Sequence, residues 1–215
     1  MTHLLKEYLT VARVSEITEI EKKSKFIAQV KPVSSVMEAE EFIAEICKKH
    51  WNATHNVYAY YIMENQVEQQ KCSDDGEPSG TSGLPTLEAI KALDLINVVV
   101  VVTRYFGGVL LGRGGLIRAY GSAARSGLLN AGIIRCVPYQ RVKIVVDYSL
   151  MGKIQNELLN AGAKIHDTLY FTEVTFIADI IPDCLSQVYQ LLQELTADQF
   201  EWELETQVYH QEQVE

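Results

Sequence analysis

A run of five valines at residues 98–102 constrains the fold of this chain more than any other segment. Neither alternate set of side chains in the run is polar, which predicts a strand, 98–105, that is buried on both faces of its sheet. Two glycine pairs follow, Gly107-Gly108 and Gly114-Gly115, and residues 116–131 then have the periodicity of a helix. The free N–H groups and the dipole at the start of such a helix attract anions.

The charge of this part of the chain runs against that of the whole. Between Leu95 and Val146 there is no Asp or Glu but there are seven Arg or Lys residues, in a chain of net charge −9. Residues 141–215 hold 13 acidic and 4 basic residues and so carry the entire excess. A local basic stretch in an acidic protein indicates an anion-binding surface. The acidic C-terminal part is not expected to lie against a phosphate backbone.

The order of the expected elements predicts the fold of the C-terminal part. They are a strand at 142–148, a helix at 150–161, strands at 164–171 and 173–181, a helix at 184–195 and a strand at 201–209. This β-α-β-β-α-β order predicts a ferredoxin-like domain, with four antiparallel strands covered on one face by two helices. The chain is therefore expected to be α+β, with domains at 1–138 and 140–215 joined by a short linker near Pro138.

The segments before the valine run predict the rest of the N-terminal domain. Residues 24–31 and 55–63 alternate as strands do, and a capping box of Ser35 and Glu38 opens a helix between them. Residues 71–83 are polar, glycine-rich and aperiodic, which indicates a loop followed by a short helix.

The sequence also bears on the compartment. The N-terminus lacks the apolar core of a secretory signal, and the longest aliphatic run is far too short to span a bilayer. The cysteines form no C-x-x-C pair, which favours reduced thiols over a zinc site or a disulfide framework: Cys47, Cys72, Cys136 and Cys184. We therefore expect a cytoplasmic protein without a membrane partner.

The first group of candidate site residues is an acidic loop at 74–83, in which five side chains can take part: Asp74, Asp75, Glu77, Ser79 and Thr81. Three carboxylates in four residues could hold a cation, act as acid and base, or meet the arginines across a cleft. A solvated acidic turn is the plainer alternative. The spacing does not match a calcium loop, so no metal is assigned.

The second group is expected to contact phosphate: Arg104, Tyr105, Gly107, Gly108, Arg113, Gly114, Gly115, Arg118 and Arg125. At about 100° per residue, Arg118 and Arg125 share one flank of the expected helix. The glycines could equally serve tight turns. The segment meets neither standard nucleotide fingerprint, so no cofactor is assigned. His55 is a further candidate, although a lone histidine is more often structural, and no catalytic residue is assigned.

Two long motifs, SDDGEPSGTSGLP at 73–85 and VVVTRYFGGVLLGRGGLIRAYG at 100–121, with His55 upstream, resemble the IMPACT/YigZ family in its bacterial, two-domain form. The resemblance implies an N-terminal domain like the second domain of the fifth small-subunit ribosomal protein. It also implies a C-terminal domain similar to the last domain of elongation factor G. The eukaryotic members act in translational control by competing for the activator of an amino-acid-starvation kinase, a role not expected to transfer to a bacterial-type chain.

These observations favour a cytoplasmic regulatory protein that associates with RNA or the ribosome through a basic cleft, without a cofactor and without catalysis. The acidic C-terminal domain would set its orientation or bind a protein partner. An enzyme acting on a small phosphorylated or nucleotide substrate is the alternative, and a pure protein-interaction module is a third. We also expect loop 74–83 and the turns at 104–115 to lie side by side.

Overall fold

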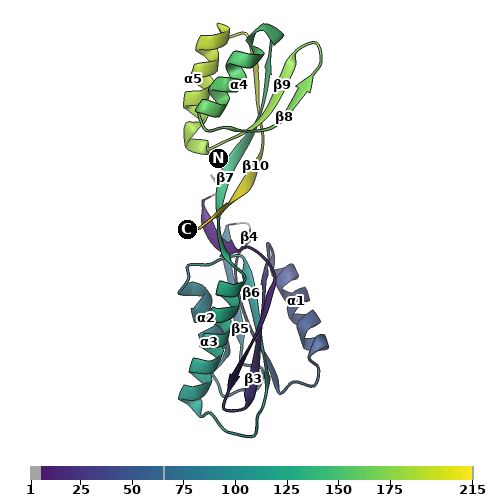
Figure 1. Ribbon diagram of the computed structural model, residues 1–215, viewed down its shortest axis with the longest axis vertical. Helices are drawn as coiled ribbons and strands as arrows, with labels where there is room; N and C mark the ends of the chain where they lie inside the picture. The colour runs from purple at the N-terminus through teal and green to yellow at the C-terminus, as the bar shows by residue number, and fades with distance from the viewer. Residues whose placement is uncertain (1–5, 65, 215) are drawn as a thin grey trace. The chain divides into compact units, whose positions relative to one another are not determined.

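The computed structural model describes residues 6–64 and 66–214, which form two compact units (Figure 1). Their main stretches are Tyr8–Arg135, here the N-terminal unit, and Cys136–Glu212, here the C-terminal unit. The division falls inside a single strand, β7 (Ile133–Val146), where the sequence predicts a linker. That part of the prediction is wrong, because proline withholds only one N–H donor and Pro138 does not end the strand. The domain limits at 138 and 140 remain a prediction.

The N-terminal unit is built on a five-stranded antiparallel sheet in the order β2-β3-β6-β4-β5. A short strand, β1 (Tyr8–Val11), precedes it. The strands of the sheet are β2 (Ser15–Glu21), β3 (Ser24–Pro32), β4 (His55–Glu64), β5 (Val67–Ser73) and β6 (Val98–Tyr105). The central strand β6 has the bounds expected from the valine run.

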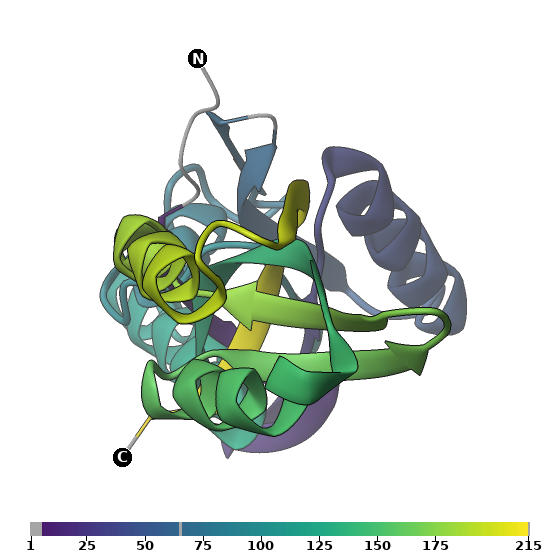
Figure 2. The ribbon, with the colours of Figure 1, turned by 90° about the horizontal axis from the view of Figure 1, so that it is seen from above.

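Helices cover both faces of this sheet (Figures 1 and 2). The helix α1 (Val36–Lys49) packs on one face, where it meets Val99 and Val101. The helices α2 (Gly83–Lys91) and α3 (Arg113–Asn130) pack on the other, against the remaining valines of β6. Burial of β6 on both faces is therefore confirmed. The face that carries α2 and α3 also carries the candidate site.

The C-terminal unit has the predicted ferredoxin-like order, and its strands run β10-β7-β9-β8 across the sheet. Its further elements are α4 (Met151–Asn160), β8 (Lys164–Tyr170), β9 (Val174–Ile180), α5 (Leu185–Thr196) and β10 (Glu201–Gln213), with short 3₁₀ turns before α4 and α5. Ile154 and Leu158 of α4 and Val188 and Leu192 of α5 enter one core with the alternate apolar residues of β7 and β9. Both helices thus lie on one face, as predicted (Figure 2).

One buried carboxylate joins three strands of the C-terminal unit. Asp179 of β9 is fully buried and accepts hydrogen bonds from Arg141 Nε at 2.7 Å and Arg141 Nη2 at 2.9 Å. His210 Nε2 of β10 lies 2.8 Å from the same carboxylate. Burial alone would raise the pKa of Asp179, but the hydrogen bonds from Arg141 and His210 outweigh it and lower the pKa.

Candidate functional site

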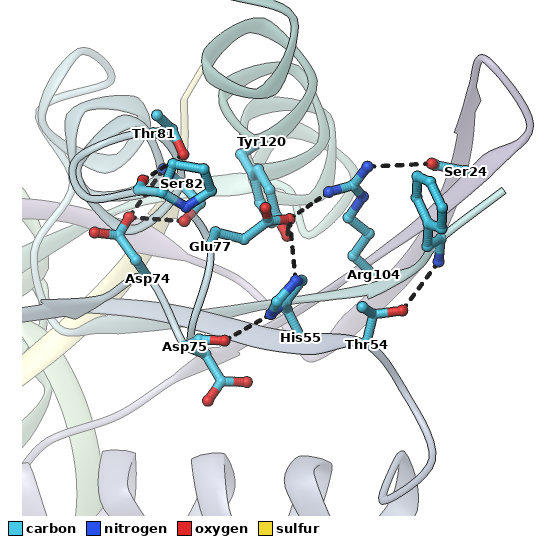
Figure 3. Close-up of polar contacts among 12 residues, drawn as sticks. Ser24, Thr54, His55, Asp74, Asp75, Glu77, Thr81, Ser82, Arg104 and Tyr120 are labelled. Atoms are coloured by element: carbon cyan, nitrogen blue, oxygen red, sulfur yellow. Dashed lines mark hydrogen bonds and ion pairs between the residues drawn. The ribbon is translucent and has the colours of Figure 1, made fainter. Parts of the chain in front are cut away.

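The candidate site forms where three neighbouring strands bring Phe26, Arg104 and His55 abreast on the face covered by α2 and α3. Arg104, at the end of β6, is only 5% exposed. Its Nη1 donates to Glu77 Oε1 of the acidic loop at 2.6 Å (Figure 3). Its guanidinium lies 5.4 Å and 5.5 Å from the ring centroids of Phe26 and Phe106. Arg104 is therefore held inside the unit by a charge partner and two aromatic rings.

The carboxylate of Glu77 is the centre of this buried cluster, which consists of His55, Glu77, Arg104 and Tyr120 (Figure 3). The same Glu77 oxygen that binds Arg104 accepts a hydrogen bond from Tyr120 Oη at 2.8 Å. Burial and the adjacent Glu77 charge raise the pKa of Tyr120. His55 Nδ1 donates to the backbone carbonyl of Asp75 at 2.7 Å, and its Nε2 lies 3.8 Å from Glu77. The cluster therefore fixes the acidic loop to the sheet and to α3.

Asp74 organises the loop from within. Its carboxylate accepts hydrogen bonds from the backbone N–H groups of Gly80, Ser82 and Gly83 at 2.8–3.0 Å, and from Ser82 Oγ at 2.7 Å (Figure 3). Burial raises the pKa of Asp74, but these hydrogen bonds together outweigh it, so the pKa lies below the usual Asp value. Asp74 thus acts as a cap for the loop and the start of α2, and the alternative of a solvated acidic turn does not apply to it.

This capping role predicts an acid dependence of stability. A pKa lowered by folding stabilises the folded state above the ordinary Asp pKa of about 3.9, and that contribution is lost as pH falls through the lowered pKa. We expect Asp74→Asn to cost about 2–3 kcal/mol at pH 7, because it breaks hydrogen bonds to a charged acceptor. The deficit should shrink below about pH 4 in urea unfolding measured across pH. A deficit that stays constant down to the acid transition would contradict this role.

The loop and the glycine- and arginine-rich turns lie side by side, as predicted. Glu77 reaches Arg104, and the backbone carbonyl of Ser79 accepts a hydrogen bond from Arg113 Nη2 at 3.2 Å. Thr81 is buried and turns inward, where its hydroxyl donates to the Pro78 carbonyl at 2.6 Å. Cation binding, acid–base action and contact with the arginines were the alternatives for the loop. The contacts of Glu77 and Ser79 correspond to the last of these.

The glycines predicted to contact phosphate have structural roles in the turns after β6 and at the start of α3. A Cβ on Gly107 would clash with the backbone carbonyl carbon of Lys23, so this glycine lets the loop pack against the β2–β3 turn. Gly108 has a φ of +81°, which disfavours other residues. The helix α3 starts at Arg113, three residues before the predicted start, so Gly114 and Gly115 lie in its first turn rather than ahead of it. Apolar periodicity does not detect a first turn that faces solvent.

Two residues that the sequence predicts to contact phosphate, Arg104 and Tyr105, are not placed to do so. Arg104 is buried in its ion pair, and Tyr105 points to the opposite face of the sheet, because successive residues of a strand alternate. The Tyr105 hydroxyl lies 3.0 Å from His50 Nδ1, at the end of α1. Neither Arg104 nor Tyr105 is therefore kept among the candidate phosphate-binding residues. Arg113, Arg118 and Arg125 are exposed on α3.

The sequence reasoning did not find Tyr120 or Ser24 as site residues. In the sequence, Tyr120 fits the apolar stripe of α3, and its hydroxyl alone indicates that it could make a polar contact. Ser24 Oγ lies 3.4 Å from Arg104 Nη2 and accepts from the Gly107 N–H at 3.2 Å. Within residues 6–64 and 66–214, no group of three or more His, Cys, Asp or Glu is placed to hold a metal ion. No helix in those ranges has the length and apolarity needed to cross a membrane.

The fold and this site define a class: a two-unit α+β protein whose first unit carries a glycine- and arginine-rich helix entry beside an acidic loop. Two family models match the same two parts. The Impact N-terminal domain matches residues 22–128, and a domain of unknown function (DUF1949) matches residues 144–199.

Similar proteins extend over most of the chain. The IMPACT family member YvyE of Bacillus subtilis is 45% identical over 173 residues, which are 80% of this chain and 79% of that protein. The IMPACT family member YigZ of Escherichia coli is 32% identical over 163 residues, 75% of this chain and 79% of its own length. A solved structure described as "Crystal structure of an hypothetical protein" is 27% identical with a TM-score of 0.61, covering 93% of this chain and 97% of that one. This chain belongs to the IMPACT family.

Proposed function

We propose that this protein binds RNA through the exposed arginines of α3 and acts in translational control. The observation that carries the proposal is a pair of exposed arginines on one flank of that helix, Arg118 and Arg125, with a third exposed arginine, Arg113, at its start. None of the three forms an ion pair within the described part of the chain, so their charges are available to a ligand. Guanidinium groups are well suited to phosphate because they offer paired donors in a plane.

The helix entry supports the same ligand. The first turn of α3 contains no acidic residue, and its N-cap, Gly112, provides no side-chain cap. The guanidinium of Arg118 reaches back over this turn, where Nη1 lies 3.6 Å from the position of a Cβ on Gly114. An anion at this end of α3 would therefore meet the helix dipole and an arginine together.

The setting of translation comes from the family resemblance alone, and the competition for a kinase activator that it implies for the eukaryotic members is not part of the proposal. The strong negative charge of residues 141–215 argues against RNA contact by the C-terminal unit. We assign that unit to a protein partner or to orientation on the ribosome. The buried cluster around Glu77 holds the loop that Arg113 contacts and so supports the shape of the RNA-binding face.

The double substitution Arg118→Ala/Arg125→Ala tests the proposal. It should weaken binding to total tRNA or ribosomes and reduce the slope of log affinity against log salt by about two units, one for each lost phosphate contact. The measurement is fluorescence anisotropy or filter binding over a salt series. Lys48→Ala/Lys49→Ala is the matched control, because it removes the same charge from the opposite side of the sheet, on α1.

Unchanged affinity and slope in the arginine variant would contradict RNA binding and favour a protein partner. The enzyme alternative has a separate outcome. Turnover of a nucleotide or sugar phosphate that disappears in His55→Ala would assign catalysis to the acidic loop and its neighbours. No nucleophile–base pair is evident among the residues that line the loop, so we propose binding without chemistry.

A further inference from the structure

A pocket of about 290 Å³ opens in the N-terminal unit between the β2–β3 hairpin and the first turns of α3. Charges of both signs line it around an apolar floor, and the residues that matter here are Glu19, Glu21, Lys22, Phe26, Leu111 and Arg118. This volume is just below the range typical of small-molecule sites, so it suits a ligand no larger than one nucleotide unit. The carboxylates of Glu19 and Glu21 have no part in the proposed phosphate contacts of α3.

The cationic side of the pocket consists of Lys22 and Arg118. Neither forms an ion pair within the described residues, although two carboxylates line the same pocket. Gly115, in the first turn of α3, also lines the pocket, and the Leu111 side chain packs against it at the position that a Cβ would take. This side therefore suits a phosphate.

The acceptor side consists of Glu19 and Glu21. They alternate along β2 in the same register as Ile17, which packs against the core under α3, so both lie on the side of the hairpin that faces α3. Neither carboxylate has a hydrogen-bond or ion-pair partner within residues 6–64 and 66–214. Two such carboxylates would repel a simple phosphate ion. They suit a phosphorylated ligand that also offers hydroxyl or amine donors.

Phe26 and Leu111 form the apolar part of the pocket. Phe26 is held in place by an edge-on contact with Tyr120 at 5.1 Å between ring centroids, and by the Arg104 guanidinium on its ring. Phe26 is only 1% exposed and lies beneath the pocket, so the half-buried Leu111 offers the apolar surface on which a flat or apolar part of the ligand can pack. The pocket thus combines a phosphate side, a hydroxyl-acceptor side and an apolar floor.

We propose that this pocket binds one ribonucleotide unit. The phosphate binds Arg118 and Lys22, the ribose 2′-hydroxyl donates to Glu19 or Glu21, and the base or sugar packs on Leu111. The inference rests on the proposed RNA-binding function and adds a selection of RNA over DNA, because the 2′-hydroxyl is the group that distinguishes them. A free mononucleotide and a nucleotide within an RNA strand offer this same chemistry.

The test compares the full chain with single-stranded RNA and DNA oligonucleotides of one sequence, and with AMP and 2′-deoxy-AMP. We expect the ribo form to bind about tenfold more tightly, as a hydrogen bond to a charged acceptor implies. Glu19→Ala/Glu21→Ala should bring this ratio to about one, since the lost negative charge raises both affinities alike while the hydroxyl contact disappears. Glu41→Ala/Glu45→Ala on α1 is the matched control and should keep the ratio.

A ratio of about one in the unsubstituted protein, or a ratio that survives Glu19→Ala/Glu21→Ala, overturns the inference. If the salt slope still responds to Arg118→Ala/Arg125→Ala, RNA binding stands and only the sugar selection fails. If neither the ribo-to-deoxy ratio nor the salt slope responds to its substitutions, both the sugar selection and the proposed RNA binding fail. A ratio seen with AMP supports a free nucleotide as ligand, and a ratio seen only with oligonucleotides supports a nucleotide within a strand.

Discussion

Replacing Glu77 by Gln is expected to lower the free energy of unfolding of the N-terminal unit by about 3–5 kcal/mol. The substitution keeps the shape of the side chain but removes the charge that neutralises Arg104, which is only 5% exposed. Phe26 and Phe106 leave the Arg104 guanidinium little contact with water that could replace the lost carboxylate. The loss should appear in hydrogen exchange of the β6 amides during urea titration of the full chain.

A second variant separates the lost ion pair from a simple packing defect. Glu77→Gln combined with Arg104→Met leaves no unpaired buried charge and should recover a large part of the loss, giving a coupling energy of about 2 kcal/mol or more. Glu88→Gln, at an exposed position of α2, is the matched control and should change little. If Glu77→Gln behaves like Glu88→Gln, the cluster does not hold the loop in place.

The C-terminal unit is expected to respond as strongly to Asp179→Asn, with a loss of about 3–5 kcal/mol. Asp179 is fully buried and is the common partner of Arg141 and His210, so its neutralisation leaves a bidentate arginine without its anion. Urea unfolding followed through exchange of the β9 amides measures the effect. Asp183→Asn, at an exposed position just before α5, is the control.

The loss caused by Asp179→Asn is also expected to depend on pH. Because folding lowers the pKa of Asp179, its contribution is present above the ordinary Asp pKa and is lost as pH falls through the lowered value. The difference between Asp179→Asn and the unsubstituted chain should therefore narrow in acid. A loss below about 1 kcal/mol at pH 7 would contradict the view that this carboxylate joins the three strands.

Elements with strong apolar periodicity could be predicted from the sequence, and polar edge strands could not. The valine run of β6 and the amphipathic helices of the C-terminal unit were found because burial imposes their pattern. The strand β5, with the sequence VEQQKCS, lies at the edge of its sheet and is largely exposed; the sequence predicts no strand there, and its last three residues fall in the predicted loop 71–83. Its pairing with β4 depends on backbone hydrogen bonds, which leave no pattern in the side chains of an exposed edge strand.

The site was predictable in its neighbourhood but not in its detail. The concentration of arginines and acids indicated that loop 74–83 and the turns after β6 meet, and Glu77 and Arg104 do so. The burial of Arg104 depends on Phe26, Phe106 and Tyr120, which come from separate parts of the chain. The need for a glycine at 107 likewise depends on Lys23, in a distant turn.

The strand order of the N-terminal sheet has a consequence for synthesis of the chain. The strands β2 and β3 pair with each other, as do β4 and β5, but β3 and β4 meet only through β6, which comes last. As the polypeptide leaves the ribosome, two hairpins therefore emerge with their facing edges open. Such edges are prone to wrong pairing until residues 98–105 arrive to close the gap. A pause in translation just before the valine codons would prolong this vulnerable interval.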